Sequence, residues 1–270
     1  MNFDDIKNRI KAFVKEELFP LEPWILNCSW DEKLTKLNEL RKKVKDGGLW
    51  LPQVPKEYGG LGLSNTQHGE ISEILGTSPY GHYCFNCQAP DAGNMEILIE
   101  FGTKEQKEAY LYPLLAGDIR SCFAMTEPDY AGSNPVNMGT MAFKKDGHYI
   151  INGHKWFTTG FDGASFAIVM LITNPEASEA HKKASQVIVP INTPGLEFIR
   201  NIPIMGHAGN GWESHSEIKF HNVKVPLTNV LGGDGEGFTI AQKRLGPGRI
   251  HHCMRWMGIC ERSFDLMCQR

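Results

Sequence analysis

The spacing of apolar residues changes twice along this chain, and these changes limit the folds it can adopt. Up to about residue 118 apolar residues recur at helical spacing, as in Phe3, Ile6 and Ile10, which is typical of amphipathic helices. From about residue 120 to 231, short apolar runs separated by Gly, Asn and Pro predict strands. A helical pattern returns at about residue 236 and continues to the last residue. We therefore expect an α+β protein.

This pattern predicts three regions. We expect an N-terminal α-helical bundle over residues 1–119, a middle β-barrel or β-sandwich domain over 120–233, and a C-terminal helical region over 234–270. Pro247 removes a backbone donor, so a kink or a boundary between two helices is expected there. The expected strands are Ser121–Met125, Ala142–Phe143, His148–Asn152, Ala167–Ile172, Gln186–Ile191 and Ser216–Phe220.

The composition is that of an ordinary globular enzyme. With 41% hydrophobic residues, a chain of 270 residues can bury a large core. Its net charge of -3 is too small to indicate nucleic acid or an anionic membrane as a partner. The amino terminus has neither the order of a secretory signal nor the bias of a transit peptide. The longest strongly apolar stretch, Phe166–Ile172, reads as a core strand and is too short to cross a bilayer.

The seven cysteines indicate reduced thiols in an intracellular compartment, because their number is odd and they are scattered. Cys84 and Cys87 have the spacing of zinc ligands, but no second pair follows. His251, His252 and Cys253 are consecutive, and adjacent residues on a helix point in different directions. We therefore expect no metal site.

Two compact segments suggest a ligand site. Ser121–Met125 is an expected strand that Pro128 stops, and Gly132 beyond it allows close approach of the backbone. A second strand of aromatic and β-branched residues, Lys155–Thr159, ends at Gly160. Two such edges could hold a flat, polar-rimmed ring between an aromatic face and hydroxyl donors. The alternative is a pair of strand ends around a tryptophan that packs in the core.

The residues of these segments are similar to a known signature. Met125–Pro128 followed by Gly132–Ser133, and then Lys155–Gly160, resembles the flavin-contacting signature of the acyl-CoA dehydrogenase family. Glu57–Gly62, Phe101–Gln106 and His221–Pro226 extend the resemblance through nearly the whole chain. Gly246–Arg249, followed by a histidine pair, looks most like the branch that includes animal members with fused kinase-like domains.

The resemblance implies FAD as cofactor and assigns residues to it. One group lies against the flavin, with the Thr126 hydroxyl suited to its pyrimidine edge; a second covers the other side of the ring and bonds its N5 edge. Ser133 is assigned to the cofactor phosphates or the CoA moiety, and a third group lines the CoA channel, where the Arg249 guanidinium can pair with phosphate. Glu127 is interpreted as tying the turn rather than acting as a base. The first group is Phe123, Ala124, Met125 and Thr126; the second is Trp156, Phe157 and Thr158; the third is Leu245, Gly246 and Arg249.

The implied reaction is α,β-dehydrogenation of an acyl-CoA thioester to the trans-2-enoyl thioester, in which a carboxylate removes the α proton and the β hydrogen leaves as hydride. In the family this carboxylate usually belongs to a third, C-terminal helical domain, and the resemblance implies that residues 234–270 are only the truncated start of that domain. In a few members it stands instead immediately before the arginine that corresponds to Arg249. Here that second position is Gly248. Glu261 and Asp265 read as solvated helix residues, so we expect the catalytic carboxylate to lie outside this chain, and leave the catalytic residue unassigned.

The resemblance also implies partners and a pathway. These are an acyl-CoA substrate, an electron-transfer flavoprotein or similar acceptor, and a homodimer or homotetramer if the third domain is present, within fatty acid β-oxidation. The implied location is the bacterial cytoplasm or the mitochondrial matrix. Two alternatives stay open: a flavin oxidase or monooxygenase on the same scaffold, and a non-catalytic, truncated product that binds a ligand without turnover.

Overall fold

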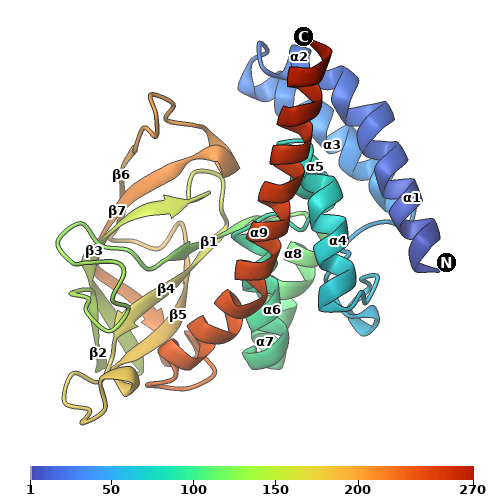
Figure 1. Cartoon of the computed structure of the whole chain (residues 1–270). Helices are drawn as coiled ribbons and strands as arrows, with labels where there is room; N and C mark the ends of the chain where they lie inside the picture. Colours follow the sequence, from blue (N-terminus) through green and yellow to red (C-terminus); the bar gives the residue numbers. More distant parts are fainter. Residues whose placement is uncertain (1) are drawn as a thin grey trace. The chain divides into compact units, whose positions relative to one another are not determined.

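The computed structural model describes residues 2–270, which form two compact units. The helical unit contains the residues up to Ala92 together with Leu245–Arg270, and the β unit contains Gly93–Arg244 (Figure 1). We describe each unit by itself. No helix within residues 2–270 is long and apolar enough to cross a membrane.

The helical unit confirms the periodicity seen in the sequence. Asn2 caps the first helix through its side chain, and the pairs Ser29–Glu32 and Ser64–Gln67 form capping boxes at two others. The helices are α1 (Phe3–Phe13), α2 (Glu22–Ile25), α3 (Trp30–Asp46), α4 (Asn65–Gly76), α5 (Gly81–Cys84) and the later part of α9 (Gly237–Gln269). Their buried apolar side chains include Ile6, Ile10, Val14, Leu37, Leu40 and Val44, which are the positions that the helical spacing predicts.

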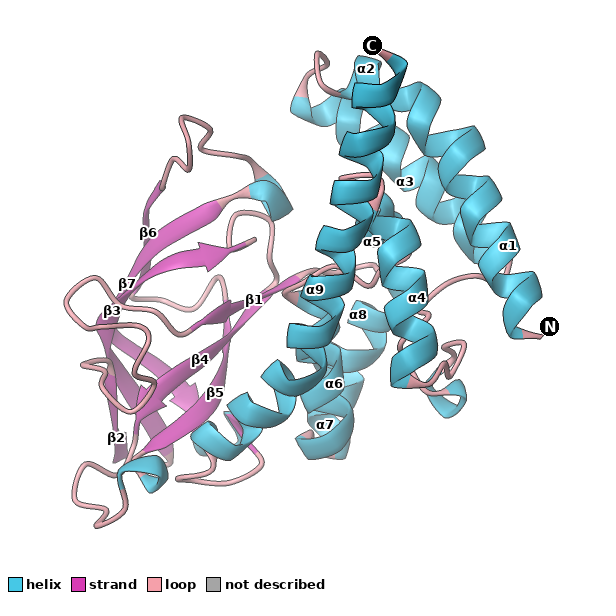
Figure 2. Ribbon diagram, viewed as in Figure 1, coloured by secondary structure: helices cyan, strands magenta, loops and turns pink. Residues whose placement is uncertain are grey.

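The β unit joins short helices and the beginning of α9 to one sheet of eight strands (Figure 2). The short helices are α6 (Asp91–Phe101), α7 (Lys104–Gln106) and α8 (Tyr112–Ala116). The strands are β1 (Ser121–Ala124), β2 (Met141–Lys145), β3 (His148–Thr159), β4 (Phe166–Ile172), β5 (Ala184–Pro190), β6 (Leu196–Asn201), β7 (His215–Pro226) and β8 (Val230–Leu231). The Gln106 side chain holds α7 to the sheet by donating to the carbonyls of Thr228 and Val230, at 2.8 and 2.9 Å.

The sheet is open, which corrects the expectation of a barrel. Its strand order is β6-β7-β3-β2-β4-β5-β8, and β1 pairs with β4 in parallel outside this path. A barrel needs its two edges to pair, whereas β6 and β8 are the ends of the path. The fold class otherwise agrees with the prediction: helices first, a β-sheet in the middle and a helix at the end.

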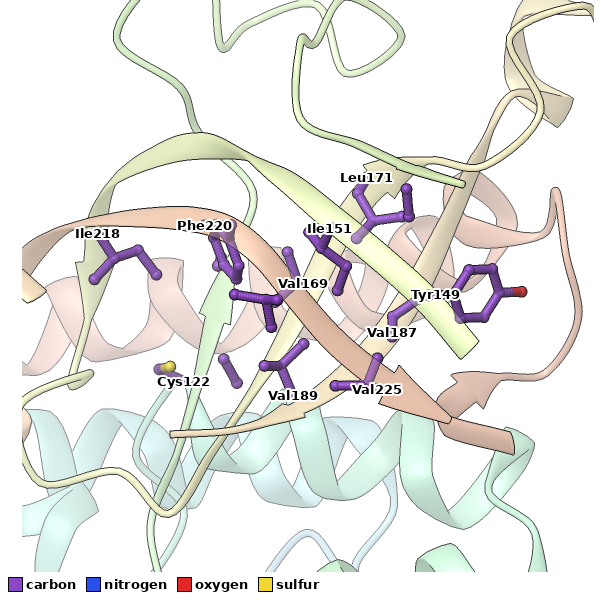
Figure 3. Close-up of a cluster of buried hydrophobic side chains, with 14 of the residues drawn as sticks. Cys122, Tyr149, Ile151, Val169, Leu171, Val187, Val189, Ile218, Phe220 and Val225 are labelled. Atoms are coloured by element: carbon purple, nitrogen blue, oxygen red, sulfur yellow. The ribbon is translucent and has the colours of Figure 1, made fainter. Parts of the chain in front are cut away.

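The interior of the β unit is a layer of aliphatic and aromatic side chains. Val169, Val189, Ile218 and Phe220 lie close to one another between the strands (Figure 3). All seven residues of β4 are buried, as expected for the continuous apolar run from Phe166 to Ile172.

One glycine in this unit is required by packing. Gly153 on β3 faces Thr140, and a Cβ at position 153 would overlap the Thr140 side chain. Gly153 also lies at a register shift between β3 and β7, where a glycine is common. The segment that leads into β2 therefore packs against β3 only because this side chain is absent.

Two further expectations from the sequence differ from the structure. The boundary expected at Pro247 is absent, because one helix, α9, runs from Gly237 to Gln269 and contains this proline. The strands β6 and β8 were not predicted. Most of β6 is exposed, so it lacks the alternation of a half-buried strand, and β8 has two residues.

Candidate functional site

The two segments singled out in the sequence lie side by side. The end of β1 and the later part of β3 are joined by a hydrogen bond, in which the Trp156 backbone N–H donates to the Thr126 carbonyl at 3.0 Å. This contact connects residues thirty positions apart in the sequence. The convergence of the two strand ends, on which the predicted site depends, is therefore confirmed.

A β-bulge shapes the second segment. The pairing of β3 with β7 shifts register between Lys155 and Thr158, and Phe157 has a φ of 47°, in the left-handed region. This conformation is a genuine outlier for a bulky residue, and bulges re-aim side chains near binding sites. The Phe157 side chain is 40% exposed, whereas Thr158 next to it is buried. The bulge thus presents an aromatic face and a hydroxyl in succession.

Two polar atoms of the bulge are buried and lack a hydrogen-bond partner in the described chain. They are the indole Nε1 of Trp156 and the hydroxyl Oγ1 of Thr158. A buried donor without a partner costs about 1–3 kcal/mol, and such groups are rare in folded proteins. Two of them within three residues indicate a place where a polar ligand completes the hydrogen bonding.

The loop after β1 supplies a small hollow beside Thr126. Met125, Thr126 and Gly132 are among its lining residues, and Ser133 is not. A Cβ at Gly132 would lie 3.0 Å from the Thr126 side chain, so a larger residue here would require this side chain to shift. Ser133 itself is exposed, which leaves its hydroxyl available to a ligand.

Glu127 holds this loop in place. Its carboxylate accepts hydrogen bonds from the backbone N–H of Gly139 and Thr140, at 2.6 and 2.9 Å, and from the Lys155 ammonium at 2.7 Å. Both oxygens of the carboxylate thus accept hydrogen bonds from donors within the protein. Its interpretation as a residue that ties the turn is confirmed.

The residues assigned to CoA divide between the two units. Leu245, Gly246 and Arg249 lie on α9 in the helical unit, where Arg249 is exposed. Ser133 and the residues assigned to FAD all lie in the β unit. Gly248 precedes Arg249 and has no side chain, so the chain has no proton acceptor at this position. The space beside its Cα is open, with no heavy atom within 4 Å of an added Cβ.

A buried polar network behind β1 was missed by the sequence reasoning. The Asn94 amide donates to Ser121 Oγ at 2.9 Å and to the Cys122 carbonyl at 3.1 Å, and Arg244 donates to Asn94 Oδ1 at 3.0 Å. The Arg244 guanidinium lies over the Phe123 ring, 4.1 Å from its centroid. Polar residues in the otherwise apolar helix α6 were the available signal.

Glu96 on the same helix belongs to the surroundings of Arg244. Burial raises the pKa of Glu96 to about 7, although Arg244 acts to lower it. A carboxyl group that titrates near neutral pH is unusual outside functional sites. No pattern in the sequence identified it, because its burial depends on the tertiary fold.

Within residues 2–270, no group of three or more His, Cys, Asp or Glu residues is arranged to hold a metal ion. Burial raises the pKa of both Cys84 and Cys87 to about 12, with only partial opposition from Arg41 and Arg255. The two thiols therefore stay protonated at neutral pH, in a form that binds metals poorly.

The sequence and the fold of this chain match those of a known protein family. The family model described as "Acyl-CoA dehydrogenase, N-terminal domain" matches residues 3–118, and "Acyl-CoA dehydrogenase, middle domain" matches residues 122–223. A solved structure from Mycobacterium abscessus, assigned to the acyl-CoA dehydrogenases, is 37% identical with a TM-score of 0.93, and the match covers 99% of this chain and 69% of that one. The chain belongs to the acyl-CoA dehydrogenase family.

Curated relatives agree with this membership. Mouse acyl-CoA dehydrogenase family member 10 is 42% identical over 97% of this chain, which corresponds to 25% of that protein. FadE2 of Mycobacterium tuberculosis, named as an acyl-CoA dehydrogenase, is 47% identical over 87% of this chain and 57% of its own length. The chain thus spans between a quarter and somewhat more than half of these two relatives.

Membership in the acyl-CoA dehydrogenase family supports FAD as the cofactor of the protein that contains this chain. The residues present fit a flavin. A flavin ring has a flat apolar body with nitrogen and carbonyl acceptors along its edge, and the bulge offers two buried donors without partners, Trp156 Nε1 and Thr158 Oγ1. The exposed Phe157 side chain and the exposed Thr126 lie in the same two segments.

Proposed function

We propose that the protein containing this chain catalyses α,β-dehydrogenation of an acyl-CoA thioester to the trans-2-enoyl-CoA. The supporting observation is the hydrogen bond between Trp156 and Thr126, at 3.0 Å, beside two buried donors that lack partners. When bound, FAD supplies the acceptor for the β hydrogen. The chain's own residues bind and orient the ring and the thioester.

In this proposal the flavin ring is held between two sets of residues. The end of β1 offers backbone groups and the Thr126 hydroxyl, while the bulge offers an aromatic cover and the Thr158 hydroxyl. Preorganised donors of this kind stabilise charge without reorganising during the reaction. The first set is Phe123, Ala124, Met125 and Thr126, and the second is Trp156, Phe157 and Thr158.

The CoA part of the substrate is assigned to Ser133, Leu245, Gly246 and Arg249. Arg249 is exposed, and a guanidinium pairs well with phosphate oxygens. We propose that a carboxylate outside residues 2–270 removes the α proton. Gly248 has no side chain to accept it, and Glu261 and Asp265 are exposed helix residues, as expected for a solvated face.

The wider setting is also proposed. The protein acts in fatty acid β-oxidation as a homodimer or homotetramer, and it passes electrons to an electron-transfer flavoprotein or a similar acceptor. An intracellular location, in the bacterial cytoplasm or the mitochondrial matrix, is supported by seven cysteines that are all free.

Anaerobic titration of the purified, flavin-loaded protein tests this function. We expect the visible absorbance of the flavin to fall when an acyl-CoA of suitable chain length is added, and the enoyl-CoA to form in equal amount. A series of saturated acyl-CoA thioesters of increasing length identifies the substrate, and the matching enoyl-CoA is the control. Rapid reaction of the reduced flavin with oxygen, without bleaching by any acyl-CoA, would favour an oxidase or monooxygenase instead. A preparation that binds no flavin would favour a non-catalytic ligand-binding protein.

A further inference from the structure

Lys155 is a fully buried cation with a specific set of partners. Its side chain is 0% exposed, and its ammonium donates to the Met125 carbonyl at 2.8 Å and to the Glu127 carboxylate at 2.7 Å. A buried charge is costly unless it is paired and hydrogen-bonded. Burial lowers the pKa of Lys155 to about 8, although Glu127 acts to raise it, so the ammonium form still predominates at neutral pH.

The pair connects three separate segments. Lys155 lies on β3, and Glu127 follows β1. The Glu127 carboxylate also accepts the N–H groups of Gly139 and Thr140, which lead into β2. One ion pair therefore holds the end of β1, the beginning of β2 and the middle of β3 at fixed separations.

The segment that this pair fixes has Thr126 at its centre. Lys155 holds the carbonyl of Met125 before it, Glu127 is the residue after it, and its own carbonyl accepts the Trp156 N–H. Lys155 is also the residue before Trp156, where the bulge of β3 begins. Both strand ends assigned to the flavin are thus fixed by the same two side chains.

We propose that the Lys155–Glu127 pair is the positioning element of the flavin site. It sets the separation between Thr126 and the donors of Trp156 and Thr158, and thereby controls the affinity for FAD and the electronic environment of the ring. The inference rests on the proposed flavin contacts of these residues. Neither Lys155 nor Glu127 needs to touch the cofactor.

A pair with only a structural role gives a different pattern. Neutral replacement of a buried ion pair is often tolerated in stability, so a structural pair can be removed without consequence for the flavin of a protein that still folds. A positioning pair, when removed, shifts the donors around the ring. The flavin spectrum and the reduction potential then change in a protein whose unfolding temperature is preserved.

The experiment uses three variants of the purified protein. Lys155→Met combined with Glu127→Gln removes both charges and leaves an amide oxygen for a backbone N–H. Glu127→Asp keeps the charge but shortens the side chain by one methylene, and Lys155→Arg keeps the charge with a different donor geometry. Arg200→Met is the matched control, because it breaks an ion pair of the same unit, Arg200–Glu217, whose arginine is exposed.

The affinity for FAD is measured by titrating the apoprotein, alongside the visible spectrum, the reduction potential and the unfolding temperature without FAD. We expect the double variant to bind FAD at least about tenfold more weakly, which corresponds to about 1.4 kcal/mol, with a shifted spectrum. Glu127→Asp and Lys155→Arg should give smaller shifts in the same direction, and Arg200→Met none. If the double variant does not fold, Glu127→Asp and Lys155→Arg decide between a positioning and a structural role.

The proposal is overturned if any folded variant of the pair binds FAD with unchanged affinity and an unchanged spectrum. It is also overturned if Arg200→Met weakens FAD binding as much as the double variant does. A wild-type protein that binds no FAD contradicts the proposed function itself, and the inference with it. Normal FAD binding by the wild type and by every variant contradicts the inference alone.

Discussion

The two units differ in the charge state of the titratable side chains that they bury. In the β unit, Lys155 and Glu127 are buried as a charged pair. In the helical unit, His68 and His82 are buried as neutral rings, and burial lowers the pKa of each. Charge fixes atoms through directional, charge-assisted hydrogen bonds, whereas a neutral ring mainly fills space. The helical unit also buries a charge, the Arg41 guanidinium, which donates to the Tyr83 carbonyl and to Asn86 Oδ1. The unit that carries the cofactor residues differs in burying a directly paired ammonium and carboxylate.

The histidines of the helical unit pack where α9 meets α4 and α5. The rings of His68 and His251 are 4.2 Å apart between centroids, in an edge-to-face arrangement. Ser72 on α4 donates to the His251 carbonyl at 3.1 Å and shares a 2.8 Å hydrogen bond with His82 Nε2. Protonation of these rings would place cations in an apolar contact, next to Arg255.

The first prediction concerns breaking the charged pair from one side. Lys155→Met leaves the Glu127 carboxylate buried without its cation, so the free energy of unfolding should fall by about 3–5 kcal/mol. Urea denaturation of the apoprotein measures it. Arg200→Met, at an exposed pair, should cost less than about 1 kcal/mol. Equal losses in the two variants would show that the Lys155 site is no more demanding than a surface pair.

The second prediction is acid sensitivity of the helical unit. The pKa of His68 is about 3 in the folded protein, below the ordinary value of about 6.5, so the unfolded chain takes up protons first. Its contribution to stability is intact above about pH 6.5 and decreases as the pH falls toward 3. By pH 4 we expect a loss of about 3 kcal/mol from His68 alone, at about 1.4 kcal/mol for each pH unit.

Denaturation curves recorded between pH 7 and pH 4 measure this loss. His68→Leu removes the titrating group, so its unfolding free energy should depend less steeply on pH. His148→Leu, on a strand of the β unit, is the matched histidine substitution outside the helical unit. A slope that is the same in wild type and in His68→Leu would contradict the assignment.

The third prediction separates the ligand-free from the flavin-bound state. Thr158→Val replaces a buried hydroxyl that has no partner in the described chain by a methyl group of similar size. We expect the apoprotein to become more stable by up to about 1 kcal/mol, because the cost of the unsatisfied group disappears. FAD binding should weaken by about 3- to 30-fold. Thermal unfolding with and without FAD measures both effects, and a stabilisation by FAD that is as large in Thr158→Val as in the wild type would contradict the proposed contact.

The fourth prediction concerns cysteine reactivity, and it involves no change in the free energy of unfolding. Cys84 and Cys87 are buried, with pKa values raised to about 12, whereas Cys253, Cys260 and Cys268 are exposed. Brief treatment of the native protein with iodoacetamide should modify the three exposed cysteines and spare Cys84, Cys87 and the buried Cys122. Mass spectrometry identifies the labelled positions. Denatured protein, in which all seven react, is the control.

The sequence predicted the parts of the fold that periodicity and short motifs encode. Helical spacing gave the helices of the first unit, and the apolar run from Phe166 to Ile172 gave β4. The motif around Thr126 and the motif around Trp156 gave the two strand ends that meet. The flavin contacts of these residues and the domain limits at residues 119 and 233 stay predictions.

Other parts depend on contacts that are distant in the sequence. Lysine is usually exposed, so the burial of Lys155 could be seen only once β1 and β3 were adjacent. Asn94 and Glu96 gave no motif, because their partners lie far along the chain. At Pro247 a kink or a boundary between two helices was expected from the local effect of proline, and α9 continues through it without a boundary.

The absence of a side chain at Gly153 makes this position intolerant of mutation. Any amino-acid substitution there adds at least one methyl group against Thr140, whose N–H is held by Glu127. A random-mutagenesis screen for colourless protein should therefore recover substitutions at position 153 as readily as in the flavin motifs themselves. In the sequence these substitutions would lie outside the residues assigned to the cofactor.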